Sequence, residues 1–383
     1  MASTMTGSAV SHEGNENVRF LLEGLVSGGE ELGLQVAAYH HGRLAIDEWA
    51  GVANTATSQR VNGETLFTVF STTKGILYGA IHLLAERRKL AYDDPVARYW
   101  PAFAARGKAG ITLAQVLDHS AGIPQIPSGT TVRDFCDWDQ MCATIAELPA
   151  LWPPGSKTGY HAYTNGWILG EVVRRIDGRS VSDFVRDEIC RPLMLKNLFL
   201  GIPDSVAARV ATLVDAPPAD GAQAVLPLRE KAMPPDLPAA ASLFNRPELR
   251  SACIPAAGGI ASARDLARFY AAMIGDGVDG ARLLPPGRVA LASRERRRDM
   301  DEVLGKEIRK SLGWFLPGPN AESIPDFPGA FGHPGAGGSV AYADPAHELA
   351  VGFTKTLLTS PVDPWTGTDV KITRRILEVL GIR

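Results

Sequence analysis

Residues 66–74 read Leu-Phe-Thr-Val-Phe-Ser-Thr-Thr-Lys and join an apolar run to a serine and a lysine three positions apart. Apolar residues continue after Lys74 at helical spacing as far as about Glu86, which predicts a helix that begins near Thr72. Side chains three positions apart share one face of a helix. We therefore expect the amine of Lys74 to lie beside the hydroxyl of Ser71.

This pair suits nucleophilic catalysis. A serine hydroxyl is a poor nucleophile until a neighbouring base takes its proton. The front of a helix carries a positive field and free N–H groups, and a partly buried lysine there is expected to have a lowered pKa and to act as a base. The same residues also fit an N-cap serine followed by a solvated lysine. The rest of the chain has to decide between the two.

The composition is that of an ordinary globular protein. The 383 residues are 45% hydrophobic and 21% charged, which suffices for two lobes or for one large α/β domain. A net charge of −3 provides no overall electrostatic attraction for nucleic acid or for an anionic membrane, and neither is expected as a partner. The mixed-sign run at 294–299 predicts a solvated helix face.

Cysteine usage and the N-terminus narrow the class further. None of the four cysteines forms a Cys-x-x-Cys pair and no zinc-type spacing occurs, so we expect reduced, buried thiols and neither metal nor cofactor. Residues 1–20 lack the basic start and apolar core of a secretory signal, and no apolar run has the length of a membrane span. These patterns predict a cytoplasmic protein.

Strand signals lie near both ends of the chain, at 34–39, 44–49, 339–343 and 349–356. Helical patterns are expected at 18–25, 72–88, 166–176, 181–189, 263–270 and 369–380.

These signals predict an α/β (α+β) fold, in which an antiparallel sheet is flanked by helices and carries a mainly helical inserted subdomain. We expect a disordered tail over 1–16 and an α/β subdomain built from 17–90 and 255–383. The proline-punctuated residues 91–254 would then form the helical insert.

Tyr163 and Asn165 form a second catalytic candidate, downstream of a proline-glycine turn. A tyrosine is a general base only if its pKa falls well below about 10, which a nearby lysine and a helix dipole favour. The asparagine can anchor that lysine. Tyr160 competes for the same role, but Ala162 stands two positions after it where an asparagine is expected. A buried aromatic residue with a capping asparagine is the structural alternative.

His333, Pro334, Gly335 and Ala336 precede the strand expected from Ser339. A glycine beside a strand lets a substrate approach the backbone closely. The N–H group that follows it can form an oxyanion hole together with the N–H of Ser71. The alternative is a glycine-rich hairpin with an incidental histidine.

The Ser-x-x-Lys, Tyr-x-Asn and x-x-Gly motifs, in this order, resemble those of the serine β-lactamase fold family. The nearest branch is that of class C β-lactamases, D-alanyl-D-alanine carboxypeptidases and family VIII carboxylesterases. Supporting segments between about 18 and 380 that also resemble the family are 117–124, 258–266, 313–314 and 344–345.

The resemblance implies a role for each motif residue. Ser71 would be the acylated nucleophile and Lys74 would assist its deprotonation. Tyr163 would be the base for attack and the acid for the leaving group. Asn165 would position Lys74 and the substrate.

The resemblance also implies that His333 and Gly335 line the strand beside the acyl group, and that the N–H groups of Ser71 and Ala336 form the oxyanion hole. Peptidases and β-lactamases of the family usually have Lys-Thr-Gly in this place, whose lysine and threonine hold a substrate carboxylate. A neutral histidine supplies no fixed charge, and Pro334 offers neither a hydroxyl nor an N–H group. A histidine here is frequent in the esterase relatives.

The function that these patterns predict is hydrolysis of small carboxylic esters through an acyl-enzyme on Ser71, with a small-molecule ester as the partner. An acyltransferase would use the same acyl-enzyme and stays open, as does a β-lactamase or D-amino-acid peptidase. A non-catalytic ligand-binding relative is the alternative outside the enzymes, and the intact Ser71, Lys74 and Tyr163 argue against it. The sequence does not predict the oligomeric state.

Overall fold

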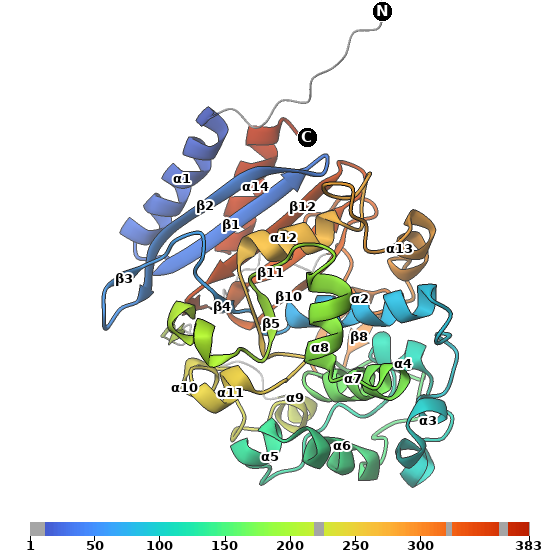
Figure 1. Cartoon of the computed structure of the whole chain (residues 1–383). Helices are drawn as coiled ribbons and strands as arrows, with labels where there is room; N and C mark the ends of the chain where they lie inside the picture. Colours follow the sequence, from blue (N-terminus) through green and yellow to red (C-terminus); the bar gives the residue numbers. More distant parts are fainter. Residues whose placement is uncertain (1–11, 218–225, 319–323, 360–366, 383) are drawn as a thin grey trace, which may run out of the picture.

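The computed structural model of the chain describes residues 12–217, 226–318, 324–359 and 367–382. Its main sheet has six strands, and every pair of neighbours is antiparallel (Figure 1). Strands from both ends of the chain meet in this sheet, which confirms the predicted architecture. Their order across the sheet is β10 (Phe331–Pro334), β11 (Val340–Asp344), β12 (Leu349–Lys355), β1 (Gly33–His40), β2 (Arg43–Asn54) and β3 (Gln59–Arg60).

Helices cover both faces of the sheet. Along β1, Ala37 and Tyr39 belong to the apolar cluster that contains α12 (Ala263–Ala271), whereas Val36 and Ala38 belong to the cluster of α1 (His12–Ser27) and α14 (Thr368–Leu380). Successive strand residues point to opposite faces, so both sets are buried. This is why β1, β11 and β12 read as nearly continuous apolar runs.

The other helices and helical turns gather mainly between residues 73 and 251. They are α2 (Thr73–Glu86), α3 (Val96–Tyr99), η1 (Pro101–Gly107), α4 (Leu113–Leu117), α5 (Val132–Cys136), α6 (Trp138–Glu147), α7 (Thr164–Asp177), α8 (Val181–Val185) with its π-helical extension η2 (Arg186–Cys190), η3 (Asp204–Arg209), α9 (Pro227–Ala232), α10 (Ala241–Phe244), α11 (Pro247–Ser251), α13 (Pro286–Ala292) and η4 (Ala336–Gly338).

The described residues also form three smaller sheets. The first orders β4 (Phe67–Thr68), β7 (Gly259–Ala261) and β5 (Leu198–Leu200), and the second pairs β6 (Val214–Asp215) with β13 (Leu357–Leu358). The third is the antiparallel pair of β8 (Arg297–Asp301) and β9 (Lys306–Lys310). The helix face predicted at 294–299 is therefore wrong, because its second half is a strand.

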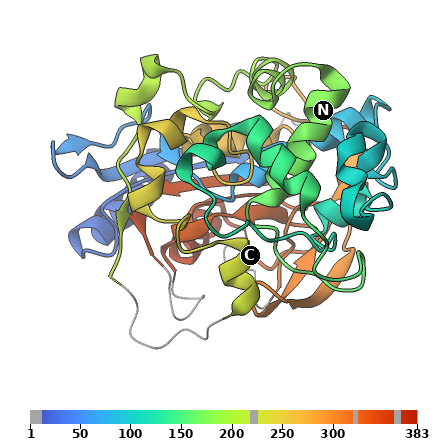
Figure 2. The same cartoon turned by 90° about the horizontal axis from the view of Figure 1, so that it is seen from below.

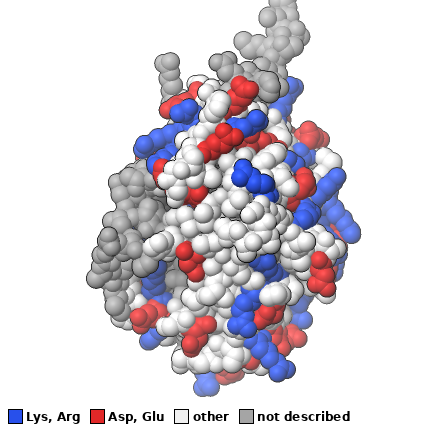
Figure 3. All heavy atoms as spheres, turned by 90° about the vertical axis from the view of Figure 1, so that its left-hand side faces the viewer, with Lys and Arg blue, Asp and Glu red and all other residues white. Residues whose placement is uncertain are grey.

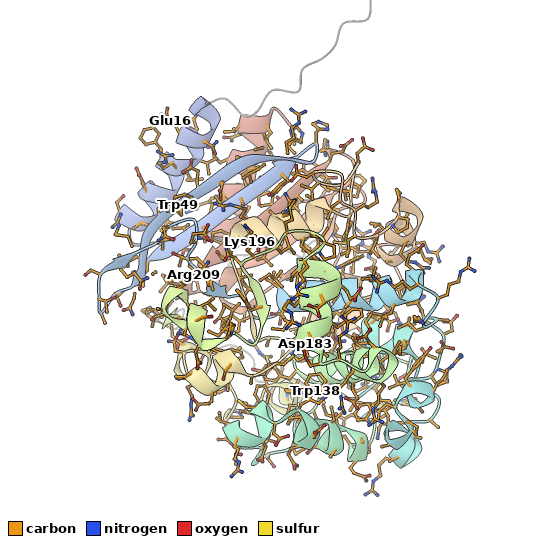
Figure 4. All side chains as sticks on the ribbon, viewed as in Figure 1. Glu16, Trp49, Trp138, Asp183, Lys196 and Arg209 are labelled. Atoms are coloured by element: carbon orange, nitrogen blue, oxygen red, sulfur yellow. The ribbon has the colours of Figure 1, made fainter. Side chains whose placement is uncertain are left out.

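The insert lies at one end of the sheet, and seen from below its helices stand in front of the strands (Figure 2). Trp138 marks it at the bottom of Figure 4, whereas Trp49 lies on the sheet near the top. Within the insert, Trp138 Nε1 donates to Glu171 Oε2 at 2.9 Å. The subdomain boundaries stay a prediction. Helix α1 begins at His12, so residues 12–16 of the predicted tail are helical and 1–11 lie outside the described residues.

Helix α2 runs through the centre of the molecule. Every residue from Thr73 to Ala85 is buried, and one apolar cluster joins this helix to α7 and α12. A helix that is apolar all round is a core element. Its N-terminus therefore meets the insert on one side and the sheet on the other.

The prediction of buried thiols is confirmed for two of the four cysteines and is wrong for the other two. Cys142 and Cys190 are buried, Cys136 and Cys253 are partly exposed, and all four are free. Acidic and basic side chains are interspersed on the face shown in Figure 3. Within the described ranges no helix combines the length and the apolar character that crossing a membrane requires. The cytoplasmic location stays a prediction.

Candidate active site

A tight backbone turn presents Ser71 at the front of α2. Phe70, which precedes it, has φ +44, a conformation that costs energy for a bulky residue. Thr73 Oγ1 donates to the Phe70 carbonyl and accepts the Gly259 N–H at 2.9 Å. These bonds tie the turn to β7 and leave the Ser71 side chain partly exposed.

Lys74 is fully buried and has three hydrogen-bond partners. Its Nζ lies 2.7 Å from the Ala162 carbonyl, 2.8 Å from the Ala256 carbonyl and 3.2 Å from Ser71 Oγ. No ion pair joins it to a carboxylate of the described residues, and burial lowers its pKa well below 10.5. A neutral amine has two hydrogens and one lone pair. The two carbonyls take the hydrogens, and the lone pair is left to accept the Ser71 proton.

Tyr160 lies against this pair. The Lys74 Nζ is 4.7 Å from the centroid of the Tyr160 ring. Burial raises the pKa of Tyr160, and a hydrogen bond with Ser71 acts in the opposite direction. The phenol is therefore protonated near neutral pH, and its hydroxyl can donate a proton beside the nucleophile.

Tyr163, the tyrosine that the sequence favoured, has other partners. Its hydroxyl donates to the Leu237 carbonyl at 3.0 Å, and its ring packs edge-on against Phe135 at 5.0 Å. Burial raises its pKa as well. Among the contacts of the described residues, those of Tyr160 and not those of Tyr163 reach Ser71 and Lys74, so the geometry favours Tyr160 as the tyrosine that exchanges protons with this pair.

The hydrogen bonds of Asn165 go to residues other than Lys74, and its predicted role in positioning Lys74 stays a prediction. Its Oδ1 accepts the hydroxyl of Tyr78 at 3.2 Å, and its Nδ2 donates to the Val116 carbonyl at 2.8 Å. The residue is fully buried on α7. Through these two hydrogen bonds it links α2 and α4 to α7.

A buried ion pair fixes the backbone of Tyr160. Asp301 Oδ1 accepts the Tyr160 N–H at 2.9 Å, and its Oδ2 pairs with Lys310 Nζ at 2.8 Å. Lys310 also donates to Thr158 Oγ1 at 3.1 Å. Both members of the pair lie on the β8–β9 hairpin, which the sequence analysis missed. Few residues of β8 are apolar, so its sequence lacks the alternation of apolar and polar residues that predicts a strand.

Two neutral histidines brace the same segment. Burial lowers the pKa of His161 to about 4 and holds that of His119 well below 6.5. His161 donates from Nδ1 to the Gly159 carbonyl, and its Nε2 accepts the Ile123 N–H at 2.9 Å. His119 Nδ1 accepts the His161 N–H at 3.1 Å. These partners assign the tautomers, and they lock the 117–124 loop onto 159–161.

His333 is buried on β10, with its ring 4.6 Å from that of Phe315 and 6.1 Å from that of Tyr160. Burial is the main cause that lowers its pKa to about 3, and Lys74 contributes when it is protonated. Nδ1 donates to the Pro334 carbonyl at 2.7 Å, and Nε2 has no hydrogen-bond partner among the described residues. The side chain therefore brings no positive charge to this strand near pH 7.

Gly335 and Ala336 follow at the end of β10. A Cβ on Gly335 would lie 2.4 Å from the Val69 carbonyl oxygen and 2.9 Å from Thr72 Oγ1, so only glycine fits against the Ser71 turn. Ala336 is exposed at the start of η4. The strand thus passes directly beside the turn that carries Ser71.

No group of three or more His, Cys, Asp and Glu residues within the described ranges is arranged to hold a metal ion. The chemistry that this site can perform from its own side chains is proton transfer between Ser71, Lys74 and Tyr160.

Comparison with known proteins identifies the family of this chain. The Beta-lactamase family profile matches residues 19–367. The Esterase/beta-lactamase LipL of Mycobacterium tuberculosis is 33% identical over 342 residues, which cover 85% of this chain and 77% of that protein.

Solved structures agree over a longer span. A penicillin-binding protein homologue from Caulobacter crescentus is 34% identical and has a TM-score of 0.87, covering 97% of this chain and 99% of its own. A family VIII carboxylesterase has the same TM-score and coverage at 30% identity. The family resemblance predicted from the motifs is confirmed.

Proposed function

We propose that this chain, which belongs to the beta-lactamase family of serine hydrolases, hydrolyses small neutral carboxylic esters through an acyl-enzyme on Ser71. One observation carries the proposal. Lys74 is buried without a carboxylate partner, and the carbonyls of Ala162 and Ala256 occupy both hydrogens of its neutral amine. The remaining lone pair is directed to Ser71 Oγ, which is the arrangement that a general base requires.

Acylation follows from this geometry. Lys74 Nζ takes the Ser71 proton while Oγ bonds to the ester carbonyl carbon and the carbonyl π electrons move to its oxygen. We assign the N–H groups of Ser71 and Ala336 to the resulting oxyanion. When the tetrahedral intermediate collapses, the carbon–alkoxide bond breaks. The leaving alkoxide takes the Tyr160 hydroxyl proton, and Lys74 replaces it.

Deacylation reverses these roles. A water molecule gives a proton to the Lys74–Tyr160 pair and its oxygen attacks the acyl carbon. The bond from carbon to Ser71 Oγ then breaks, the carboxylic acid leaves, and Ser71 recovers a proton. Tyr160 takes the place that the sequence analysis gave to Tyr163, and it acts as a proton donor because its phenol stays protonated.

The preference for neutral esters rests on β10. His333 is uncharged near neutral pH, and Pro334 has no hydroxyl or N–H group to offer. A substrate carboxylate would find no fixed cation on this strand. This argues against β-lactams and peptide C-termini as main substrates. One of the similar proteins is named as an esterase/beta-lactamase and another as a family VIII carboxylesterase, and both names include the ester class.

A substrate panel tests the proposal. We expect turnover of short-chain p-nitrophenyl esters, much slower hydrolysis of a chromogenic cephalosporin, and loss of ester turnover in Ser71→Ala with the fold retained. Intact mass after treatment with a fluorophosphonate should show one adduct in wild type and none in Ser71→Ala. Near wild-type activity in Ser71→Ala would make another residue the nucleophile.

Added alcohol acceptors extend the same assay. Hydrolysis predicts that free carboxylic acid remains the main product when an alcohol is present at millimolar concentration. A predominance of the new ester would make the enzyme an acyltransferase, which uses the same Ser71 chemistry.

A further inference from the structure

The glycine turn beside Ser71 rests on a second segment of the chain. A Cβ on Gly337 would lie 2.5 Å from Leu358 Cδ2, and the Thr359 N–H donates to the Gly337 carbonyl at 3.3 Å. The Cβ position of Gly338 is 3.3 Å from Lys355 Cδ and 3.4 Å from its Nζ. Both glycines have positive φ, +79 and +106, so the turn packs its bare backbone on residues 355–359.

Lys355 is itself held at three points. Its Nζ pairs with Glu31 Oε1, donates to Thr359 Oγ1 at 2.9 Å and lies 3.4 Å from Thr368 Oγ1. Thr368 Oγ1 donates to the same Glu31 oxygen at 2.6 Å. The side chains of Lys355 and Glu31 are 1% and 0% exposed. This cluster fastens the end of β12 to the segment before β1 and to the start of α14.

A buried ion pair of this kind is weak evidence for stability, because removing two charges from water costs about as much as their attraction returns. Its consequence here is geometric. The turn from Gly335 to Gly338 contains three glycines and has little stiffness of its own. The support beneath it therefore decides where its N–H groups point.

We propose that Glu31 and Lys355 are positioning residues that set the place of the Ala336 N–H in the oxyanion hole. This inference rests on the proposed ester hydrolysis at Ser71. An oxyanion donor acts only when it is aimed at the position that the negative oxygen reaches in the transition state. A misplacement of about 1 Å costs on the order of a hundredfold in rate.

The test compares an ester with the thionoester that differs only in having C=S for C=O. Sulfur is a weak hydrogen-bond acceptor, so a working oxyanion hole favours the oxygen ester. The double variant Glu31→Gln with Lys355→Met removes both charges and keeps the volume. We expect its kcat for the ester to fall about tenfold to a hundredfold, with KM changed little. Its oxygen-over-sulfur preference should fall by a similar factor.

General loss of folded protein lowers both rates equally and leaves this preference unchanged. An oxygen-over-sulfur preference within about twofold of wild type in the folded double variant would overturn the proposal. Wild-type failure to hydrolyse esters would instead defeat the proposed function, and this result is read before any variant is made.

Leu358→Ala provides a second route should the double variant not fold. It removes the partly exposed side chain under Gly337 without touching a charge, and we expect the same direction of change at smaller size. Lys108→Met is the matched control. Lys108 is another fully buried lysine, held by the carbonyls of Ala105, Ala146 and Leu148. It should keep the wild-type preference, and an unchanged preference in Leu358→Ala too would count against the proposal.

Discussion

Lys74 and Lys310 are both fully buried and both contact the segment that carries Tyr160. Lys310 has a carboxylate partner in Asp301, and that pair holds the Tyr160 backbone. Lys74 has two carbonyls and a serine hydroxyl, and burial lowers its pKa. A buried lysine with a carboxylate partner can hold a neighbouring segment in place, whereas we propose that a buried lysine without one acts as a base.

We expect the largest effect from a substitution of Lys74, the lysine without a carboxylate partner. Lys74→Met should lower kcat for p-nitrophenyl esters by about a hundredfold to ten-thousandfold, because general base catalysis is lost. The fold should persist, since no buried anion is left without a partner. Circular dichroism and steady-state kinetics measure the two results. A Lys74→Met enzyme within tenfold of wild-type kcat would show that another group deprotonates Ser71.

Lys310→Met removes the buried ion pair between Lys310 and Asp301. It leaves Asp301 buried and unpaired, which should lower the free energy of unfolding by about 3–5 kcal/mol. Denaturant titration measures this loss. Asp301→Asn in the same chain removes the orphaned charge and should recover much of the stability. If Lys310→Met were as stable as wild type, the ion pair would not be the clamp described here.

We expect the next largest effect from substitutions of the two tyrosines, Tyr160 and Tyr163. Tyr160→Phe removes the hydroxyl beside Ser71 and should lower kcat on the order of a hundredfold. Tyr163→Phe removes the hydrogen bond to Leu237 and should cost about 1 kcal/mol of stability with little change in kcat. A larger kinetic loss in Tyr163→Phe would restore the original sequence prediction.

The smallest effect concerns charge on β10. Together, His333→Lys and Pro334→Thr supply a cation and a hydroxyl where wild type has a neutral histidine and a proline. A charge-assisted hydrogen bond is worth about 1.5–3 kcal/mol, so the rate on a carboxylate-bearing β-lactam relative to a neutral ester should rise roughly tenfold to a hundredfold. An unchanged ratio would remove these two residues as the cause of the preference.

Much of the fold was predictable because its signals are local. The apolar periods at 34–39, 349–356 and 369–380 specify elements that the structure contains as β1, β12 and α14. The pairing of Ser71 with Lys74 was equally local, since a helix places residues three apart side by side.

Which tyrosine lies beside Lys74 was not predictable in the same way. Tyr160 and Tyr163 both precede α7, which begins at Thr164, and the backbone there decides which of the two lies beside Lys74. That backbone is set by His119, His161 and Asp301, which are distant in sequence from one another or lie on an unpredicted hairpin. The exposed and charged residues of β8 carry too few apolar positions to show a strand.

The protonation state of Lys74 decides whether it can act as the base. In its neutral form it accepts the Ser71 proton, so kcat/KM should rise with pH through the lowered pKa of Lys74 and then level off. The free energy of unfolding should also rise with pH. The unfolded chain binds this proton up to about pH 10.5 and the folded chain does not, so Lys74 lowers stability less as the pH rises towards that value.

The most direct measurement is an NMR titration of the lysine Nζ signals in ¹⁵N-labelled protein, with the Lys74 signal identified by its absence in Lys74→Met. We expect a Lys74 midpoint well below 10.5, with the amine neutral at the pH where ester turnover is maximal. A Lys74 signal that titrates near 10.5 while turnover is already maximal at pH 7–8 would contradict it.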